Sequence, residues 1–382
     1  MDVTRKHIIP LAAAVLLVAA FLVVFLSVRQ KNVVVAFHNL PSAAQSAIRK
    51  AIEQKPLKGL QVEFAILSAD KPVEHQLSQK PAPDILICRA GLVMEKATTV
   101  SAERNAGIVQ DVLVDMPNAL KNSAVVQNSL VLAVPLLVDH YELAVSRNPS
   151  GQHPFLFAGG KSHVLLALAG SIAESNFGPA VALQLALDCR QTDLSQIPMM
   201  QSIAKIMANQ ILSGSIPLST LTLQEEELSV YMTNAHPDAV FMPLSFHRTL
   251  PLDALKRHSA VVFPSRFNER TLTAPVIYGV PLSGKKRINA TVCQILLELV
   301  TMETQEFLSK ESGLAPVHAN AQTPDIQSSD VRYWVSATNP PLATLGEAAF
   351  ETSAELDKAA QTFRDMILEH VHSDSSRNLG NQ

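Results

Sequence analysis

The stretch Gly159-Gly160-Lys161-Ser162 contains the Gly-Lys-Ser triplet of phosphate-binding loops. The complete motif needs another glycine five residues before the one that precedes lysine, and Phe155 stands at that position. The stretch therefore predicts a turn into a helix rather than a nucleotide site. The start of such a helix can still offer backbone N–H groups to a ligand.

Other short motifs of catalysis or metal binding are missing from the chain. Twelve histidines are present, but His38, His140, His163 and His247 fall in separate predicted loops and would all have to converge to share a metal ion. The sequence has no H-E-x-x-H and no G-x-S-x-G motif. Its three cysteines are far apart and odd in number, which argues against a zinc site and a disulfide framework. We therefore expect no metal and no cofactor, and the commonest hydrolase signatures are absent.

Length and charge set two broad limits on the protein. A chain of 382 residues with 47% apolar side chains exceeds what one core usually holds, so two lobes are expected. The 31 basic and 34 acidic residues give a net charge of −3, and no dense Lys/Arg stripe is present. Nucleic acid is therefore not an expected partner.

The N-terminus carries a segment that meets a membrane. Residues 8–28, from Ile8 to Val28, hold no charge and are long enough as a helix to cross a hydrocarbon core. The end of the segment, Phe25 to Arg29, offers no small-residue cleavage site, which favours an uncleaved anchor over a cleaved signal peptide. Basic residues flank both ends, so charge alone does not fix the orientation. Both interpretations of the segment stay open.

The chain after this segment follows a strand–helix–strand pattern. Val33 to Phe37 is an apolar run of strand length, and Ser42 to Gln45 has the spacing of a capping box at the start of a helix. Further strands are predicted at Val62 to Leu67 and Ile85 to Cys88. These elements predict a doubly wound α/β sheet, whose ligands bind beyond the carboxyl ends of the strands. By that rule the candidate ligand-binding residues at these ends are His38, Asn39, Ser42, Cys88 and Arg89.

The second half of the chain predicts another α/β lobe. Helix-like sequence fills much of Phe155 to Ile211, and short buried strands are predicted at Asp238 to Pro243 and Ala260 to Pro264. Ala274 to Leu282 would then return the chain to the first lobe. A helix that begins at Thr301 should end at Gly313, because glycine suits the left-handed C′ position and Pro316 prevents continuation.

Two stretches resemble a known family. Gln305-Glu306-Phe307-Leu308, followed by Gly313 and Pro316, is similar to a segment near the end of the extracellular solute-binding proteins of bacterial ABC importers, in the sugar-binding branch that includes maltose-binding protein. The passage with Pro135, Asp139, Leu143 and Asn148 resembles the family's first crossing between lobes, although the usual tyrosine before the asparagine is replaced.

This resemblance implies a two-lobed periplasmic-binding-protein fold in which the chain crosses between the lobes three times, preceded by the N-terminal transmembrane helix. The crossings are expected near Val138 to Tyr141, Phe267 to Thr273 and Asn320 to Ile326. Lobe 1 would comprise residues 33–138 and 274–322, and lobe 2 residues 142–268 and 326–372. Residues 373–382 would form a polar tail.

The resemblance also adds candidates for the ligand site. Tyr333 and Trp334, in the run R-Y-W-V-S-A, resemble an aromatic pair of the sugar-binding branch that stacks on pyranose rings. Stacking suits sugars because their C–H faces are apolar, but Trp334 can equally fill the core of a lobe. Asp139 and Tyr278 join the candidates because each lies at a predicted crossing or strand end.

The resemblance implies that the protein is the substrate-binding component of an ABC importer and not an enzyme. It would be a monomer that captures a small polar solute, most simply a carbohydrate, and delivers it to permease subunits. The globular part would face the periplasm or cell exterior, held at the inner (cytoplasmic) membrane by a single span. The alternative is a membrane-anchored sensor or interaction protein that keeps the fold without transport. An anchored hydrolase is the third possibility, since an active site without a short motif leaves no signal in the sequence.

Overall fold

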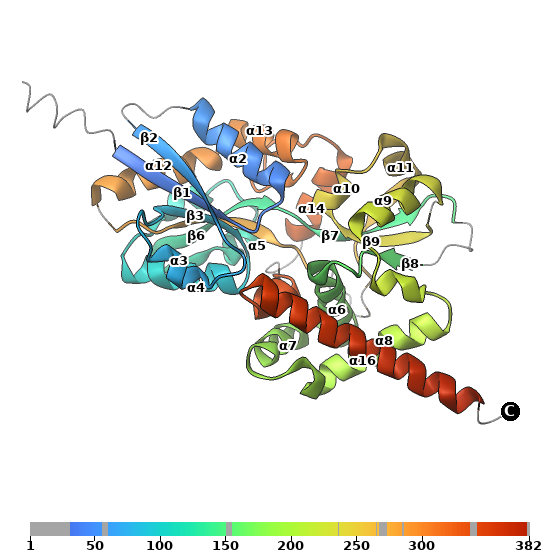
Figure 1. Cartoon of the computed structure of the whole chain (residues 1–382). Helices are drawn as coiled ribbons and strands as arrows, with labels where there is room; N and C mark the ends of the chain where they lie inside the picture. Colours follow the sequence, from blue (N-terminus) through green and yellow to red (C-terminus); the bar gives the residue numbers. More distant parts are fainter. Residues whose placement is uncertain are drawn as a thin grey trace, which may run out of the picture.

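The computed structural model describes residues 31–55, 60–149, 155–235, 237–264, 266, 273–284, 286–336 and 342–379. These residues form two β-sheets, each with helices packed on it (Figure 1). Within the described ranges we find no helix with the length and apolarity needed to span a bilayer. The predicted anchor or signal segment at 8–28 lies outside them.

The first sheet has eight strands and contains the predicted strand–helix–strand unit. Its strands β1 (Lys31–His38), β2 (Leu60–Leu67) and β3 (Ile85–Arg89) pair in parallel, and α2 (Ser42–Gln54) joins the first two. The predicted capping box is wrong, because Ser42 is the first helical residue and no side chain caps the helix. Strands β11 (Val276–Pro281) and β6 (Leu130–Val138) complete the middle of the sheet in antiparallel pairings.

The edge of this sheet is built from short strands around β6, and helices cover both of its faces. Helices α2 and α13 lie on one side of the sheet in Figure 1, and α3 and α4 on the other. The additional elements are β4 (Ile108–Val109), β5 (Val125–Gln127), β12 (Ala315–Pro316), α3 (Val73–Leu77), α4 (Leu92–Glu103), α5 (Asn118–Ser123), α12 (Lys286–Leu299) and α13 (Met302–Ser312). We call this sheet with its helices lobe 1.

The predicted helix stop in lobe 1 is confirmed. Helix α13 follows Thr301, whose side chain accepts a hydrogen bond from Thr304 N, and Gly313 after the helix has a left-handed φ of 73°. Gln305 on this helix is fully buried and donates to Leu136 O at 2.9 Å, which fixes the helix to β6. The segment is therefore a structural landmark of lobe 1.

The second sheet has four strands in the order β10-β7-β9-β8, and we call it with its helices lobe 2. Its strands are β7 (Tyr141–Ser146), β8 (Phe155–Phe157), β9 (Ala239–Pro243) and β10 (His258–Val261). Its helices are α6 (Ser162–Phe177), α7 (Pro179–Gln191), α8 (Pro198–Leu212), α9 (Glu225–Asn234), α10 (Leu244–His247), α11 (Leu252–Arg257), α15 (Leu345–Ala349) and α16 (Ser353–Leu379). Helix α16 continues through residues 373–379 of the predicted polar tail.

Neighbouring segments of the chain join the two sheets. Only Asp139 and His140 separate β6 from β7, and Asp139 N donates to Pro275 O at 2.9 Å, just before β11. Most of the predicted crossing from Phe267 to Thr273 lies outside the described residues. Helix α14 (Ile326–Ser336) was expected in lobe 2, but its buried Val331 packs in the core of lobe 1.

Candidate ligand-binding cleft

A cavity of about 550 Å³ opens between the two lobes. Lobe 1 and lobe 2 both contribute side chains to it, so the cavity is an interlobe cleft. Its polar and aromatic lining residues are His38, Asn39, Ser42, Arg89, Lys161, Ser162, His163, Glu225, Ser245, Phe246, Thr249, Glu347, Phe350, Glu351, Thr352, Ser353 and Asp357. The volume falls within the range of roughly 300–1,000 Å³ that is usual for small-molecule sites.

The lobe 1 wall is formed where the parallel strands β1 and β3 end. His38 is the last residue of β1, Asn39 follows in the turn, and Ser42 is the first residue of α2. His38 is 5% exposed, and within the described part of the chain its Nε2 has no hydrogen-bond partner. Burial lowers the pKa of His38, and the charge of Glu351 counteracts part of that effect. A neutral His38 can therefore donate to or accept from a ligand.

The lobe 2 wall includes the Gly-Lys-Ser stretch, whose Ser162 is the first residue of helix α6. Ser162 Oγ donates to Asp357 Oδ1 at 2.6 Å, and His163 Nε2 lies 3.7 Å from Glu225 Oε1. The interaction with His163 lowers the pKa of Glu225, although burial opposes this. The carboxylates of Asp357 and Glu225 thus already have protein partners. They retain lone pairs that can accept hydrogen bonds from the hydroxyl groups of a ligand.

A largely buried ionic network joins Arg89 and Glu347 of the cleft lining to Asp139, which lies outside that lining. Arg89 Nη2 lies 2.6 Å from Asp139 Oδ2, and Arg89 Nη1 lies 2.9 Å from Glu347 Oε1 on α15. Asp139 also accepts from the backbone N and the Oγ of Ser245, each at 2.8 Å. Burial by itself lowers the pKa of Arg89, but the charges of Glu347 and Asp139 raise it above its usual value. The network thus fixes a charged Arg89 where the two lobes meet.

Burial acts in the opposite direction on the acid of this network. It raises the pKa of Asp139, and Arg89 and Ser245 counteract part of the increase. Asp139 is completely buried and supports Arg89 and Ser245, both of which line the cleft.

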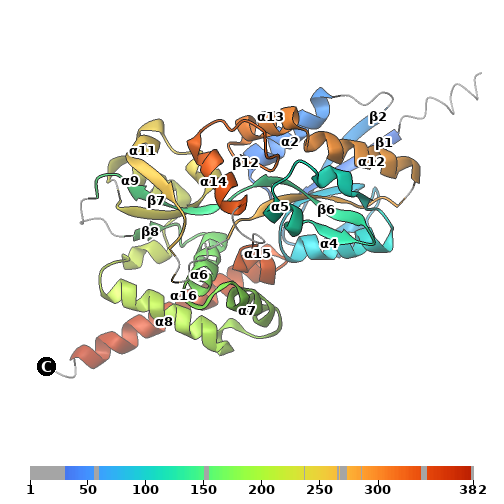
Figure 2. The ribbon, with the colours of Figure 1, turned by 180° about the vertical axis from the view of Figure 1, so that it is seen from behind.

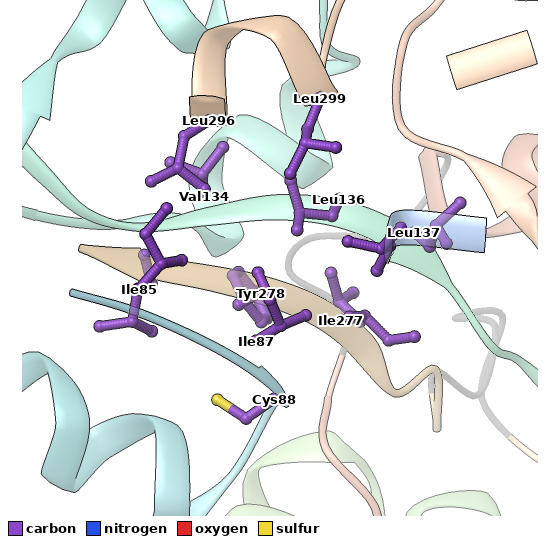
Figure 3. Packing of buried hydrophobic residues seen from close by; sticks show 14 of the residues in the cluster. Ile85, Ile87, Cys88, Val134, Leu136, Leu137, Ile277, Tyr278, Leu296 and Leu299 are labelled. Atoms are coloured by element: carbon purple, nitrogen blue, oxygen red, sulfur yellow. The ribbon is translucent and has the colours of Figure 1, made fainter. Parts of the chain in front are cut away.

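The predicted candidates fall into separate places. His38, Asn39, Ser42 and Arg89 line the cleft together. The structure places Cys88 and Tyr278 in the core of lobe 1 instead, where they are 0% and 2% exposed (Figure 3). Successive side chains of a strand point to opposite faces, so Cys88 points away from the side that Arg89 uses. Tyr278 is the register partner of Cys88, and its hydroxyl donates to Ser123 O at 3.1 Å.

The aromatic pair expected to stack on a ligand lies elsewhere. Neither Tyr333 nor Trp334 is among the described residues that line the cleft. Trp334 packs against the core of lobe 1 with its ring centroid 5.5 Å from that of His140, and Tyr333 is 62% exposed. The aromatic residues in the cleft are Phe246 and Phe350. The sequence held no motif for them, although Phe246 follows the end of strand β9, where the strand-end rule applies.

The cleft shows no metal centre in the residues that can be described, where no group of three His, Cys, Asp or Glu side chains is arranged to hold an ion. The cleft is lined by neutral hydrogen-bonding groups, by paired charges and by two phenylalanine rings. Such a lining suits a polar ligand with many hydroxyl groups and an apolar face.

Comparison with solved structures identifies the fold. The bacterial solute receptor AcbH, described as having an exclusive preference for β-D-galactopyranose, matches with a TM-score of 0.65 and 11% identity over 90% of this chain and 99% of its own. A probable secreted solute-binding lipoprotein from Streptomyces coelicolor matches with a TM-score of 0.60 and 12% identity, over 90% of this chain and 98% of its own. The binding protein RafE in complex with raffinose matches with a TM-score of 0.56 and 11% identity, over 89% of this chain and 100% of its own.

Sequence comparison adds nothing to this assignment, since no protein-family model and no curated protein matches the chain. At these identities the structural likeness establishes the architecture. The chain has the two-sheet α/β fold of the extracellular solute-binding proteins, over nearly the whole length of those neighbours.

Proposed function

We propose that this protein is the substrate-binding component of an ABC importer and holds a carbohydrate in the interlobe cleft for delivery to permease subunits. The observation that carries this proposal is the cleft itself, which has a suitable volume and polar residues from both lobes at the ends of β1, β3 and β9. Neighbours with the same fold are described as binding galactopyranose and raffinose. A binding protein of this kind carries out no catalysis.

The arrangement of the chain supports a closing motion of the lobes. We place two crossings between the lobes at residues 138–141 and 267–273. Because α14 packs on lobe 1, the third crossing comes between α14 and α15 rather than at 320–326, and the lobes are otherwise divided as the sequence predicts. Hinge motion about these segments would enclose the ligand. Side chains from both walls could then bind it at the same time, which is why we assign the ligand to the cleft rather than to one lobe.

We further propose that residues 8–28 tether the protein to the cytoplasmic membrane, with both lobes on the outer side. Mass spectrometry of the mature N-terminus tests this. A terminus between Val28 and Val33 would show that the segment is removed.

Calorimetric titration of the full-length protein in detergent tests the ligand class. Galactose, N-acetylglucosamine and raffinose are the probes, with amino acids and divalent metal ions as the competing classes. We expect heat from at least one sugar. Heat only from amino acids or metal ions would refute the carbohydrate assignment.

A matched pair of variants then tests the site. His38→Gln alters the buried imidazole in the cleft and should weaken sugar binding about tenfold, the equivalent of one hydrogen bond of about 1.4 kcal/mol. His75→Gln changes an exposed histidine of α3 outside the cleft and should leave affinity unchanged. Equal affinities in the two variants would place the sugar outside the cleft.

A further inference from the structure

The segment Phe350–Ser353, which we call the strap, joins α15 to α16 and lies against lobe 1 although both helices belong to lobe 2. Glu351 makes the principal contacts. Its Oε1 accepts from Val73 N at 2.6 Å, and its Oε2 lies 2.8 Å from Lys96 Nζ on α4. Ser353 N also donates to Ala69 O at 2.8 Å. The strap is thus fixed to lobe 1 through both its side chains and its backbone.

The other end of the strap is anchored in lobe 2. Phe350 packs against the large core of that lobe, next to the buried residues Leu345 and Ala349 of α15. Helix α15 lies beside α4 of lobe 1 (Figure 2). The approach is so close that a Cβ on Gly91 would lie 2.2 Å from Glu347 O.

A second cavity, of about 460 Å³, lies on the other side of the strap. Phe350 and Glu351 line both this chamber and the cleft. The second chamber is otherwise formed by α4, α7 and α16, with Lys96, Arg190 and Lys358 among its lining residues. The strap is therefore the wall that the two cavities share.

A further contact between the lobes borders the second chamber. Arg190 of α7 donates to both carboxylate oxygens of Glu95 on α4, each at 2.8 Å, and its Nε donates to Ala348 O at 2.8 Å. Such bidentate pairs are geometrically specific. The strap and this pair together hold the lobes at one end of the cleft, so that a ligand extending in this direction meets protein rather than solvent.

We propose that the strap sets the length of the ligand: the cleft binds a sugar of one or two rings, and Phe350 and Glu351 exclude longer oligosaccharides from the second chamber. This inference rests on the proposed function and deepens it by naming the substrate class. A chain of three or more rings running along the cleft would have to displace Glu351 from Val73 and Lys96. That displacement exposes a partly buried ion pair and lowers affinity for the longer ligand.

The test is a titration of the full-length protein with glucose, galactose and N-acetylglucosamine series of one to four rings. The measured quantity is the ratio of the Kd for a three-ring sugar to the Kd for the best one- or two-ring sugar. A substitution that weakens the binding of both sugars equally leaves this ratio unchanged. We expect a ratio of at least ten. Glu351→Ala and Lys96→Ala, which release the strap in different ways, should each reduce the ratio to about three or less.

Glu74→Ala is the matched control. Glu74 also contacts Lys96, at 3.3 Å, but it is 57% exposed and lies outside both cavities, so its removal should leave the ratio unchanged. Thermal denaturation establishes that each variant is folded. Equal affinity of the unmodified protein for short and long sugars, or an unchanged ratio in both strap variants, would overturn the inference while leaving the proposed function intact. Failure of every sugar to bind would overturn both.

Discussion

Arg89 and Asp139 form an ion pair whose acid is completely buried, with 2.6 Å between Arg89 Nη2 and Asp139 Oδ2. The pair joins the end of β3 to the connection between the two sheets. Removing the charge of Asp139 leaves Arg89 with Glu347 as its remaining ionic partner and weakens the hydrogen bonds that Ser245 donates to the carboxylate. We expect Asp139→Asn to lower the free energy of unfolding by about 3 kcal/mol.

Urea denaturation of the purified protein measures this change. Glu53→Gln is the control, because Glu53 pairs with Arg49 on the exposed surface of α2 and such pairs contribute less than about 1 kcal/mol. Similar losses in the two variants would show that the Arg89 network does not contribute specially to stability.

Gly91 permits the close approach of α15 to lobe 1. Its φ is 127°, and an added Cβ would lie 2.2 Å from Glu347 O. Gly91→Ala therefore combines backbone strain with a clash and should lower stability by about 3 kcal/mol. Gly214→Ala has a φ of 78° but no atom within 4 Å of the added carbon, so only backbone strain of about 1 kcal/mol is expected. Thermal unfolding of both variants separates the two effects.

Trp334 is expected to stabilise lobe 1 rather than bind ligand. Trp334→Ala removes a ring that packs against this core and His140, and should cost about 2 kcal/mol of stability. Affinity for a sugar identified by calorimetry should stay within about twofold, because Trp334 is outside the cleft lining that the structure describes. Tyr333→Ala, at a 62% exposed position, should change stability by less than about 0.5 kcal/mol. A tenfold loss of affinity in Trp334→Ala would instead support stacking on the ligand.

His140 predicts a dependence of stability on pH. Burial lowers the pKa of His140 to about 4, with Glu142 counteracting part of the shift. The same group in an unfolded chain has a pKa of about 6.5, so between these values the unfolded state binds a proton that the folded state does not. The free energy of unfolding therefore decreases as the pH falls from about 6.5 toward about 4, because protonation of His140 favours the unfolded state.

His140→Phe keeps an aromatic ring beside Trp334 and removes the titrating group. Between pH 7 and pH 5 the unmodified protein should lose roughly 2 kcal/mol more stability than this variant, as measured by urea unfolding at each pH. Parallel losses would mean that His140 is protonated in the folded protein at pH 5.

Local signals in the sequence determined much of the secondary structure. Thr301 and Gly313 mark the two ends of α13, since a cap and a left-handed stop depend on a few adjacent residues. The apolar run from Val33 to Phe37 indicated a buried parallel strand, and the strand-end rule then placed His38 and Arg89 in the cleft. The helix ends and the strand are confirmed, because each depends on short-range patterns. That His38 and Arg89 bind a ligand stays a prediction.

The tertiary structure alone decided which aromatic rings reach the cleft and what closes its end. Phe246 and Phe350 are over one hundred residues apart in the chain, and Glu351 meets Val73 and Lys96 only because α15 folds back onto lobe 1. Tyr333 and Trp334 had the more suggestive sequence, yet α14 packs on lobe 1 and holds them away from the cleft lining. Local sequence specifies helices and strands, whereas the packing of distant apolar faces decides which side chains share a cavity.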